Sequence, residues 1–298
     1  MDENYLKEQQ EEKPEEGAEK NLYTLVFKHL SITFFGEIIL LFLFGILSIL
    51  AYTNSRLPEG FDEFEKESKI EIQKDLIKEA EEFSARDPDG FINEYFRILT
   101  QDSHSLLLWG SLLWLVSFIL PGYYFLYKFS KYPLLNFEPP IGYREVGVGI
   151  MMGGLVFVSV SGLMLILQLL GYNPKGNPTQ QILLTALKGN IGLLGWSLYT
   201  VGLITGFIEE LYFRGFLLDN YLKSGYARFG LMFTSVLFGM MHYSPQGSLF
   251  VPILLSFVGL YFGLIYTVTR NIWITAIVHT TYNSLGILVA YYVGEMNI

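Results

Sequence analysis

The chain has 298 residues, of which 51% are hydrophobic and 16% aromatic, and its mean hydropathy is +0.35. This composition is too apolar for a soluble domain of that length. The formal net charge of −9 argues against a nucleic-acid partner, because nucleic-acid binding requires clustered lysine and arginine. The chain contains no cysteine, which excludes disulfides, thiolate metal sites and a cysteine nucleophile.

Apolar runs occupy most of the chain outside two charged segments. Several of these runs approach the roughly 20 residues that a helix needs to cross a bilayer, and together they predict an all-α, polytopic membrane protein with about seven transmembrane helices. In chain order, the predicted spans are residues 30–52, 105–127, 146–170, 191–218, 229–243, 248–268 and 272–293.

The two charged segments have different patterns. Residues 1–28 form an acidic tail, which we expect to be disordered because it cannot bury apolar surface, and the membrane domain follows over 29–298. Residues 53–103 carry aromatic and aliphatic side chains at helical spacing among Glu and Lys, which predicts two amphipathic extramembrane helices joined by a turn at 87–90. Their apolar faces are expected to lie on the membrane surface or to cap the bundle.

The distribution of basic residues among the short loops predicts an orientation. Lysine and arginine concentrate on the side that contains the N-terminus and the turns after the second, fourth and sixth spans. The positive-inside rule places that side in the cytoplasm and residues 53–103 outside. The first 20 residues are acidic and lack an apolar core, so a cleavable signal peptide is not expected.

Ionisable and amide side chains inside the last spans are the strongest functional signal. Such groups are costly in hydrocarbon and therefore indicate function. They form three units in which two residues are four positions apart and share a helix face. The units are Glu210 with Arg214, accompanied by Glu209; Phe238 with His242; and His279 with Asn283.

The depth of these groups suggests that they meet. Counted at about 1.5 Å per residue from the ends of antiparallel spans, Glu209, His242, His279 and Asn283 fall in the same middle layer of a roughly 30 Å core. Residues 190–293 are therefore the expected catalytic core. Within it, Glu210 can pair with Arg214, which leaves Glu209 as the less neutralised acid and the better base.

Water activation is the chemistry that this set allows. A buried glutamate can act as general base while an imidazole shares the water or relays its proton. A second imidazole and an amide N–H can donate hydrogen bonds to an oxyanion as a carbonyl becomes tetrahedral. These are the components of an amide hydrolase without a protein nucleophile.

The three units resemble the motifs of the CPBP family of intramembrane proteases, which contains the type II CAAX prenyl endopeptidases and bacteriocin-processing enzymes. The resemblance covers about residues 190–293 and departs at Gly206, where many members have proline. It implies an intramembrane endopeptidase in which Glu209 and His242 activate water and His279 and Asn283 stabilise the oxyanion. Glu210, Arg214 and Phe238 would support the site.

The resemblance also bears on cofactors, partners and location. It leaves a zinc-dependent reaction open, with Glu209, His242 and His279 as the ligands; we favour a reaction without a metal, because Glu209 and His242 can activate water unaided. The expected partners are membrane lipid and a hydrophobic or lipidated peptide or protein substrate, and the expected location is a prokaryotic cell membrane. The alternatives are an ion- or proton-coupled transporter and a non-catalytic scaffold of the same fold.

Overall fold

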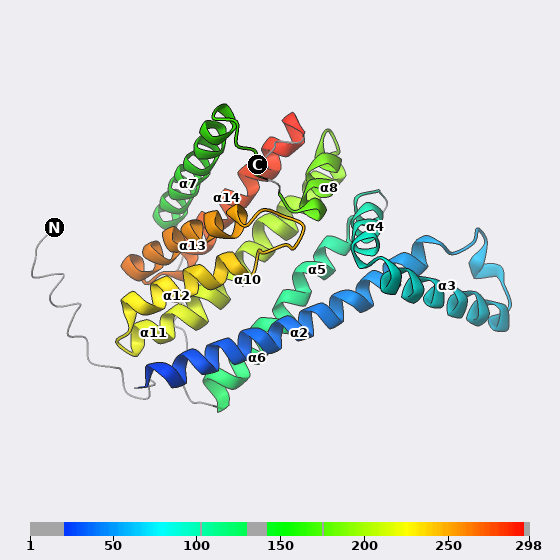
Figure 1. Ribbon diagram of the computed structural model, residues 1–298, viewed down its shortest axis with the longest axis horizontal. Helices are drawn as coiled ribbons and strands as arrows, with labels where there is room; N and C mark the ends of the chain where they lie inside the picture. Colours follow the sequence, from blue (N-terminus) through cyan, green and yellow to red (C-terminus); the bar gives the residue numbers. More distant parts are fainter. Residues whose placement is uncertain (1–20, 102, 130–141, 175, 295–298) are drawn as a thin grey trace, which may run out of the picture.

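Helices make up all the regular structure in the described part of the chain, which is residues 21–101, 103–129, 142–174 and 176–294 of a computed structural model (Figure 1). Residues 1–20 of the predicted disordered tail lie outside that part. The first helix, α2 (Leu22–Ser55), begins before residue 30, where the first span was predicted to start. It does so because the Asn21 side chain accepts hydrogen bonds from the N–H groups of Tyr23 and Thr24 and so caps the helix.

Several of the later spans are built from more than one helical segment. The second span contains two π-helical stretches, η2 and η3, and the fourth contains two more, η4 and η5. The elements after residue 103 are α5 (Leu106–Trp114), η2 (Leu115–Ile119), α6 (Leu120–Gly122), η3 (Tyr123–Phe129), α7 (Tyr143–Leu169), α8 (Pro178–Leu187), α9 (Ile191–Ser197), η4 (Leu198–Thr205), α10 (Gly206–Glu210), η5 (Leu211–Leu218), α11 (Asp219–Lys223), α12 (Ala227–Met240), α13 (Phe250–Thr269) and α14 (Ile272–Val293).

Six helical segments of the described chain are long and apolar enough to cross a membrane. They are Leu22–Ser55, Leu106–Lys128, Tyr143–Leu169, Ile191–Lys223, Phe250–Thr269 and Ile272–Val293. The remaining predicted span is α12, which is apolar but has 14 residues. It is about 21 Å long, less than the roughly 30 Å hydrocarbon core. The protein is a polytopic helical membrane protein, as its composition predicted.

The fourth span lies at the centre of the bundle (Figure 1). It contacts the second span on one side and α12, α13 and α14 on the other, and α7 packs on the outside of α14. All eight residues of η5 except Leu211 are buried. The charged residues of this span are therefore surrounded by protein and not by lipid.

Glycines allow the helices around the fourth span to approach closely, as their spacing predicted. A Cβ atom added to Gly153 of α7 would lie 2.6 Å from the carbonyl oxygen of Val278 on α14, and Gly149 meets α14 in the same way. Gly259 and Gly263 of α13 face α12. These contacts fix α14 against α7 and α13 against α12. Both α13 and α14 also contact the fourth span.

The segment between the first two spans projects from one end of the bundle (Figure 1). It contains η1 (Phe61–Glu63), α3 (Lys66–Arg86) and α4 (Pro88–Gln101). Helix α4 packs against α2 and α8 and therefore caps the bundle, whereas Ala80 is the one buried residue of α3. The turn predicted at 87–90 is the N-terminus of α4, because Asp87 accepts the Gly90 N–H group and Pro88 occupies the first helical position.

Candidate active site

Helix α10 carries Glu209 and Glu210 and lies between the two π-helical stretches of the fourth span. It packs against α14, which carries His279. Gly206 is the first residue of α10 and faces Thr280. A Cβ atom at position 206 would lie 3.4 Å from the Thr280 backbone nitrogen. Helices α10 and α14 therefore pass each other at about van der Waals distance at this position, three residues before the two acids.

A buried ion pair anchors the site, at the spacing that the sequence predicted. Arg214 Nη1 donates to Glu210 Oε1 over 2.8 Å, and Nη2 donates to the Gly259 carbonyl over 2.8 Å. Both side chains are fully enclosed, at 1% and 0% exposed. The guanidinium thus joins the fourth span to α13 and compensates the Glu210 charge.

The same carboxylate oxygen of Glu210 also orients His279. The distance from His279 Nδ1 to Glu210 Oε1 is 2.9 Å, and because a carboxylate accepts, Nδ1 carries the proton. The opposite ring nitrogen, Nε2, lies 3.8 Å from Glu209 Oε2. Glu210 therefore holds the His279 ring so that Nε2 faces Glu209, in the manner of a carboxylate that orients a catalytic or metal-bound histidine.

These four ionisable side chains share one charge balance. Arg214 compensates one of the two carboxylates, and burial of the second without a counter-charge would be costly. The cluster is neutral when one proton is held by either Glu209 or His279. Glu209 and His279, the two groups that can hold this proton, face each other across 3.8 Å, a little beyond the roughly 2.6–3.2 Å of a direct hydrogen bond.

His242 lies just past the end of α12, and its ring is half-buried. Its Nδ1 lies 2.7 Å from the Phe238 carbonyl oxygen, which can only accept, so Nδ1 carries the proton and Nε2 keeps its lone pair. The imidazole next to Glu209 in the structure is that of His279. The predicted pairing of Glu209 with His242 stays a prediction.

Phe238 provides the shared wall of the site. Its ring centroid lies 4.8 Å from the His242 ring and 5.9 Å from the His279 ring. The Arg214 guanidinium lies 4.8 Å from the same centroid, a cation–π distance. The two histidines predicted to share a site therefore both contact one buried phenylalanine.

Asn283, one turn after His279 on α14, makes a contact between helices. Its Nδ2 donates to the Val201 carbonyl of η4 over 3.2 Å. The amide carries two hydrogens on that nitrogen, so one N–H remains for another acceptor. Asn283 also lines a cavity of about 190 Å³ between α7, α8 and α14.

Sequence reasoning missed two contributors to this site. The Phe262 ring lies 4.9 Å from the His279 ring and 5.4 Å from the Arg214 guanidinium, and the Gly259 carbonyl binds Arg214. The spacing of Gly259 and Gly263 indicated close packing, but neither a phenylalanine nor a backbone carbonyl shows its role in a sequence.

Comparison with family models gives a match over part of the chain. Residues 191–285 match the model described as type II CAAX prenyl endopeptidase Rce1-like. These residues form an Rce1-like domain. The Rce1-like family is a peptidase family, and the matched region contains the seven residues of the three predicted units. Comparison with curated proteins and with solved structures found no match.

Proposed function

We infer that this protein is an intramembrane endopeptidase that hydrolyses a peptide bond next to a hydrophobic or lipidated segment of its substrate. The observation that carries this proposal is the buried cluster of Glu209, Glu210, Arg214 and His279, in which two carboxylates and an imidazole meet inside a membrane bundle. The Rce1-like match over the same residues supports peptide hydrolysis as the reaction.

In the proposed reaction Glu209 removes a proton from water as the water oxygen attacks the peptide carbonyl carbon. The His242 Nε2 lone pair accepts the second hydrogen of that water and orients it. When the tetrahedral intermediate collapses, the C–N bond breaks and Glu209 returns the proton to the leaving amine. A base of this kind contributes about 10²- to 10⁴-fold in rate.

Stabilisation of the oxyanion is assigned to His279 and Asn283. In the form in which the cluster proton is on His279, its Nε2–H is a charged donor whose orientation is set by Glu210. The second N–H of the Asn283 amide is the other donor. Arg214 and Phe238 are positioning residues, since they hold Glu210 and the histidine rings and do not touch the substrate.

Buried acceptors provide further support for a site that binds water or substrate. Among the described residues, Glu210 Oε2 is one of several buried side-chain atoms without a hydrogen-bond partner, and it is the one within the Glu209–His279 cluster. Native proteins leave few such atoms unpaired unless they take part in function or bind water. This oxygen lies beside the proposed reacting groups.

The proposal routes the reaction through side chains alone. Zinc takes carboxylate and imidazole ligands, so a zinc-dependent reaction with Glu209, His242 and His279 as the ligands stays the alternative. The proposed substrate is a protein in or at the membrane. A cytoplasmic N-terminus and a prokaryotic cell membrane remain predictions.

The test incubates the purified protein with a prenylated CAAX peptide and with the same peptide unmodified, each with and without a strong zinc chelator. We expect cleavage that resists the chelator and that Glu209→Gln and His242→Ala abolish. Glu37→Gln, which neutralises a glutamate of α2 outside the site, is the matched control and should cleave normally. Full activity of Glu209→Gln or His242→Ala would contradict the assigned roles; residue-dependent ion flux without proteolysis would favour a transporter.

A further inference from the structure

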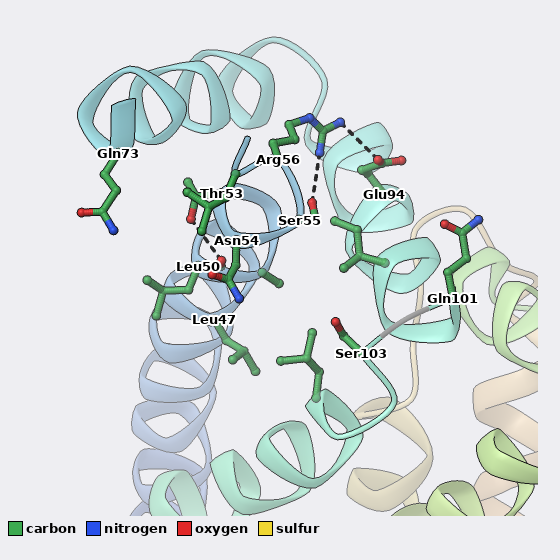
Figure 2. A pocket seen from close by; sticks show the side chains of 14 residues that line it. Leu47, Leu50, Thr53, Asn54, Ser55, Arg56, Gln73, Glu94, Gln101 and Ser103 are labelled. Carbon is green, nitrogen blue, oxygen red and sulfur yellow. Dashed lines mark hydrogen bonds and ion pairs between the residues drawn. The ribbon is translucent and has the colours of Figure 1, made fainter. Parts of the chain in front are cut away.

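A cavity of about 690 Å³ lies where α2 ends and α5 begins, far along the chain from the Rce1-like domain. We call it the α2–α4 cavity; its lining includes Leu47, Leu50, Arg56, Glu94 and Gln101. Figure 2 shows Arg56 and Glu94 at one end and Leu47 and Leu50 toward the other. Its volume is within the range of about 300–1,000 Å³ that small-molecule sites occupy.

The cavity lies at the ends of two candidate membrane spans. Helices α2 and α5 belong to two candidate membrane spans, and the cavity is at the C-terminal end of the first and the N-terminal end of the second. The projecting helices α3 and α4 form its outer wall. A ligand in it would meet polar groups on the water side and apolar groups on the membrane side.

The polar end of the wall carries one cation, Arg56, and one anion, Glu94, which Arg97 also contacts from outside the wall. Arg56 Nη2 lies 3.2 Å from Glu94 Oε1, and its guanidinium stacks 3.7 Å from the Tyr52 ring centroid. Nη1 donates to Ser55 Oγ over 3.4 Å. A guanidinium has five N–H donors, so this contact set leaves donors for an oxyanion at the mouth of the cavity.

The apolar end continues onto the surface of α2. Ile38, Phe42, Ile46 and Leu50 recur at every fourth position and all are exposed, and Leu50 also lines the cavity. Residues four apart share one helix face. This strip is roughly 18 Å long at 1.5 Å per residue, and it leads from the cavity into the membrane.

We propose that the α2–α4 cavity binds one glycerophospholipid with a zwitterionic headgroup. The phosphate accepts hydrogen bonds from Arg56, and the headgroup ammonium lies near Glu94. One acyl chain follows Leu50 onto the exposed strip of α2. The argument is charge complementarity: the cavity wall presents one cation, Arg56, and one anion, Glu94, which match the two charges of a zwitterionic headgroup.

Arg97 provides a matched control for Arg56. Its Nη1 contacts the other oxygen of the same carboxylate, Glu94 Oε2, over 2.7 Å, but its side chain is not part of the cavity wall. Arg56→Gln and Arg97→Gln therefore remove the same charge and one ion pair with the same partner. They differ in whether the lost guanidinium faces the cavity.

The experiment measures lipid retention by native mass spectrometry on the full chain, delipidated in detergent. The four probes are phosphatidylethanolamine, phosphatidylglycerol, diacylglycerol, and phosphoethanolamine, which has the headgroup without the tails. We expect one phosphatidylethanolamine to be retained most strongly. Arg56→Gln should lower the lipid occupancy at least fivefold, and so should Asn54→Trp, which fills the cavity mouth from an exposed position. Arg56→Lys should retain part of the occupancy. Arg97→Gln should stay within twofold of the unmodified chain.

Four results would overturn the proposal. The first is an equal loss of lipid occupancy in Arg56→Gln and Arg97→Gln. The second is retention of diacylglycerol or phosphatidylglycerol as strong as that of phosphatidylethanolamine, and the third is binding of phosphoethanolamine alone. The fourth is displacement of the lipid by a substrate peptide whose binding depends on Arg56 in the same way. Circular dichroism and size-exclusion profiles confirm that each variant is folded. The test is independent of peptidase activity, so failure of one proposal leaves the other standing.

Discussion

Replacement of Arg214 by glutamine tests the physical basis of the site. Arg214 and Glu210 are 1% and 0% exposed and are joined at 2.8 Å, so removal of the guanidinium leaves a buried carboxylate without its counter-charge. Breaking a buried pair in this way costs about 3–5 kcal/mol of unfolding free energy, whereas removing both charges together is often close to neutral. We therefore expect Arg214→Gln to be strongly destabilising and the double variant Glu210→Gln/Arg214→Gln to recover much of that loss.

Thermal and denaturant unfolding in one detergent measure these differences. The control is Lys78→Gln, because Lys78 and Glu82 have the same four-residue spacing but are 75% and 70% exposed, at 3.8 Å. An exposed pair of this kind contributes about 0–1 kcal/mol. If Arg214→Gln costs no more than Lys78→Gln, or if the double variant is as unstable as the sum of its single variants, the account of Arg214 as the compensating charge is refuted.

Two further variants test how the helices that carry the site are held together. Gly153→Ala should destabilise the protein by about 1–3 kcal/mol through overpacking, because the new Cβ would lie 2.6 Å from the Val278 carbonyl oxygen. At the control position, Gly154, a new Cβ would have no atom within 4 Å, so Gly154→Ala should be neutral. Equal melting temperatures for the two variants would contradict the close packing of α7 on α14. Asp219→Ala removes the acceptor of the Tyr266 hydroxyl at 3.0 Å and of Lys223 at 2.7 Å. It should cost about 1–3 kcal/mol because the buried Tyr266 hydroxyl loses its acceptor. Asp219→Asn, which keeps an acceptor, should cost less, and a calorimetric melt that ranks the two in the opposite order would contradict this role.

Local patterns predicted the helices and one of the site contacts. Apolar runs of about 20 residues identify membrane helices because the bilayer thickness sets their length. The Glu210–Arg214 pair follows from a four-residue spacing on a single helix. Both predictions use only the geometry of one helix, which is the same in every fold.

Contacts between helices could not be predicted in the same way. His29, next to a lysine, has the pattern of a residue flanking a membrane span, but it is fully buried with its ring 4.9 Å from that of Tyr221. The His279 contact with Glu210 joins residues 69 apart in the chain. Such pairings depend on helix rotation and register, and these are set by packing of the whole bundle.

The π-helical stretches on both sides of α10 are a second feature that the sequence does not show. Such stretches are uncommon and occur often at functional sites. They change the rotation per residue along the fourth span, so side-chain directions counted with the α-helical rotation of about 100° per residue are wrong over part of its length. This limits how well the relative directions of Glu209 and the histidines can be predicted from spacing alone.

The turnover number of Glu209→Gln with a cleavable peptide tests the central claim most directly. Glutamine keeps the size of the side chain in its buried position 3.8 Å from His279 but cannot take a proton from water. If Glu209 is the general base, kcat should fall by about 10²- to 10⁴-fold with KM and the melting temperature nearly unchanged. A kcat within a few-fold of that of the unmodified protein would contradict the claim.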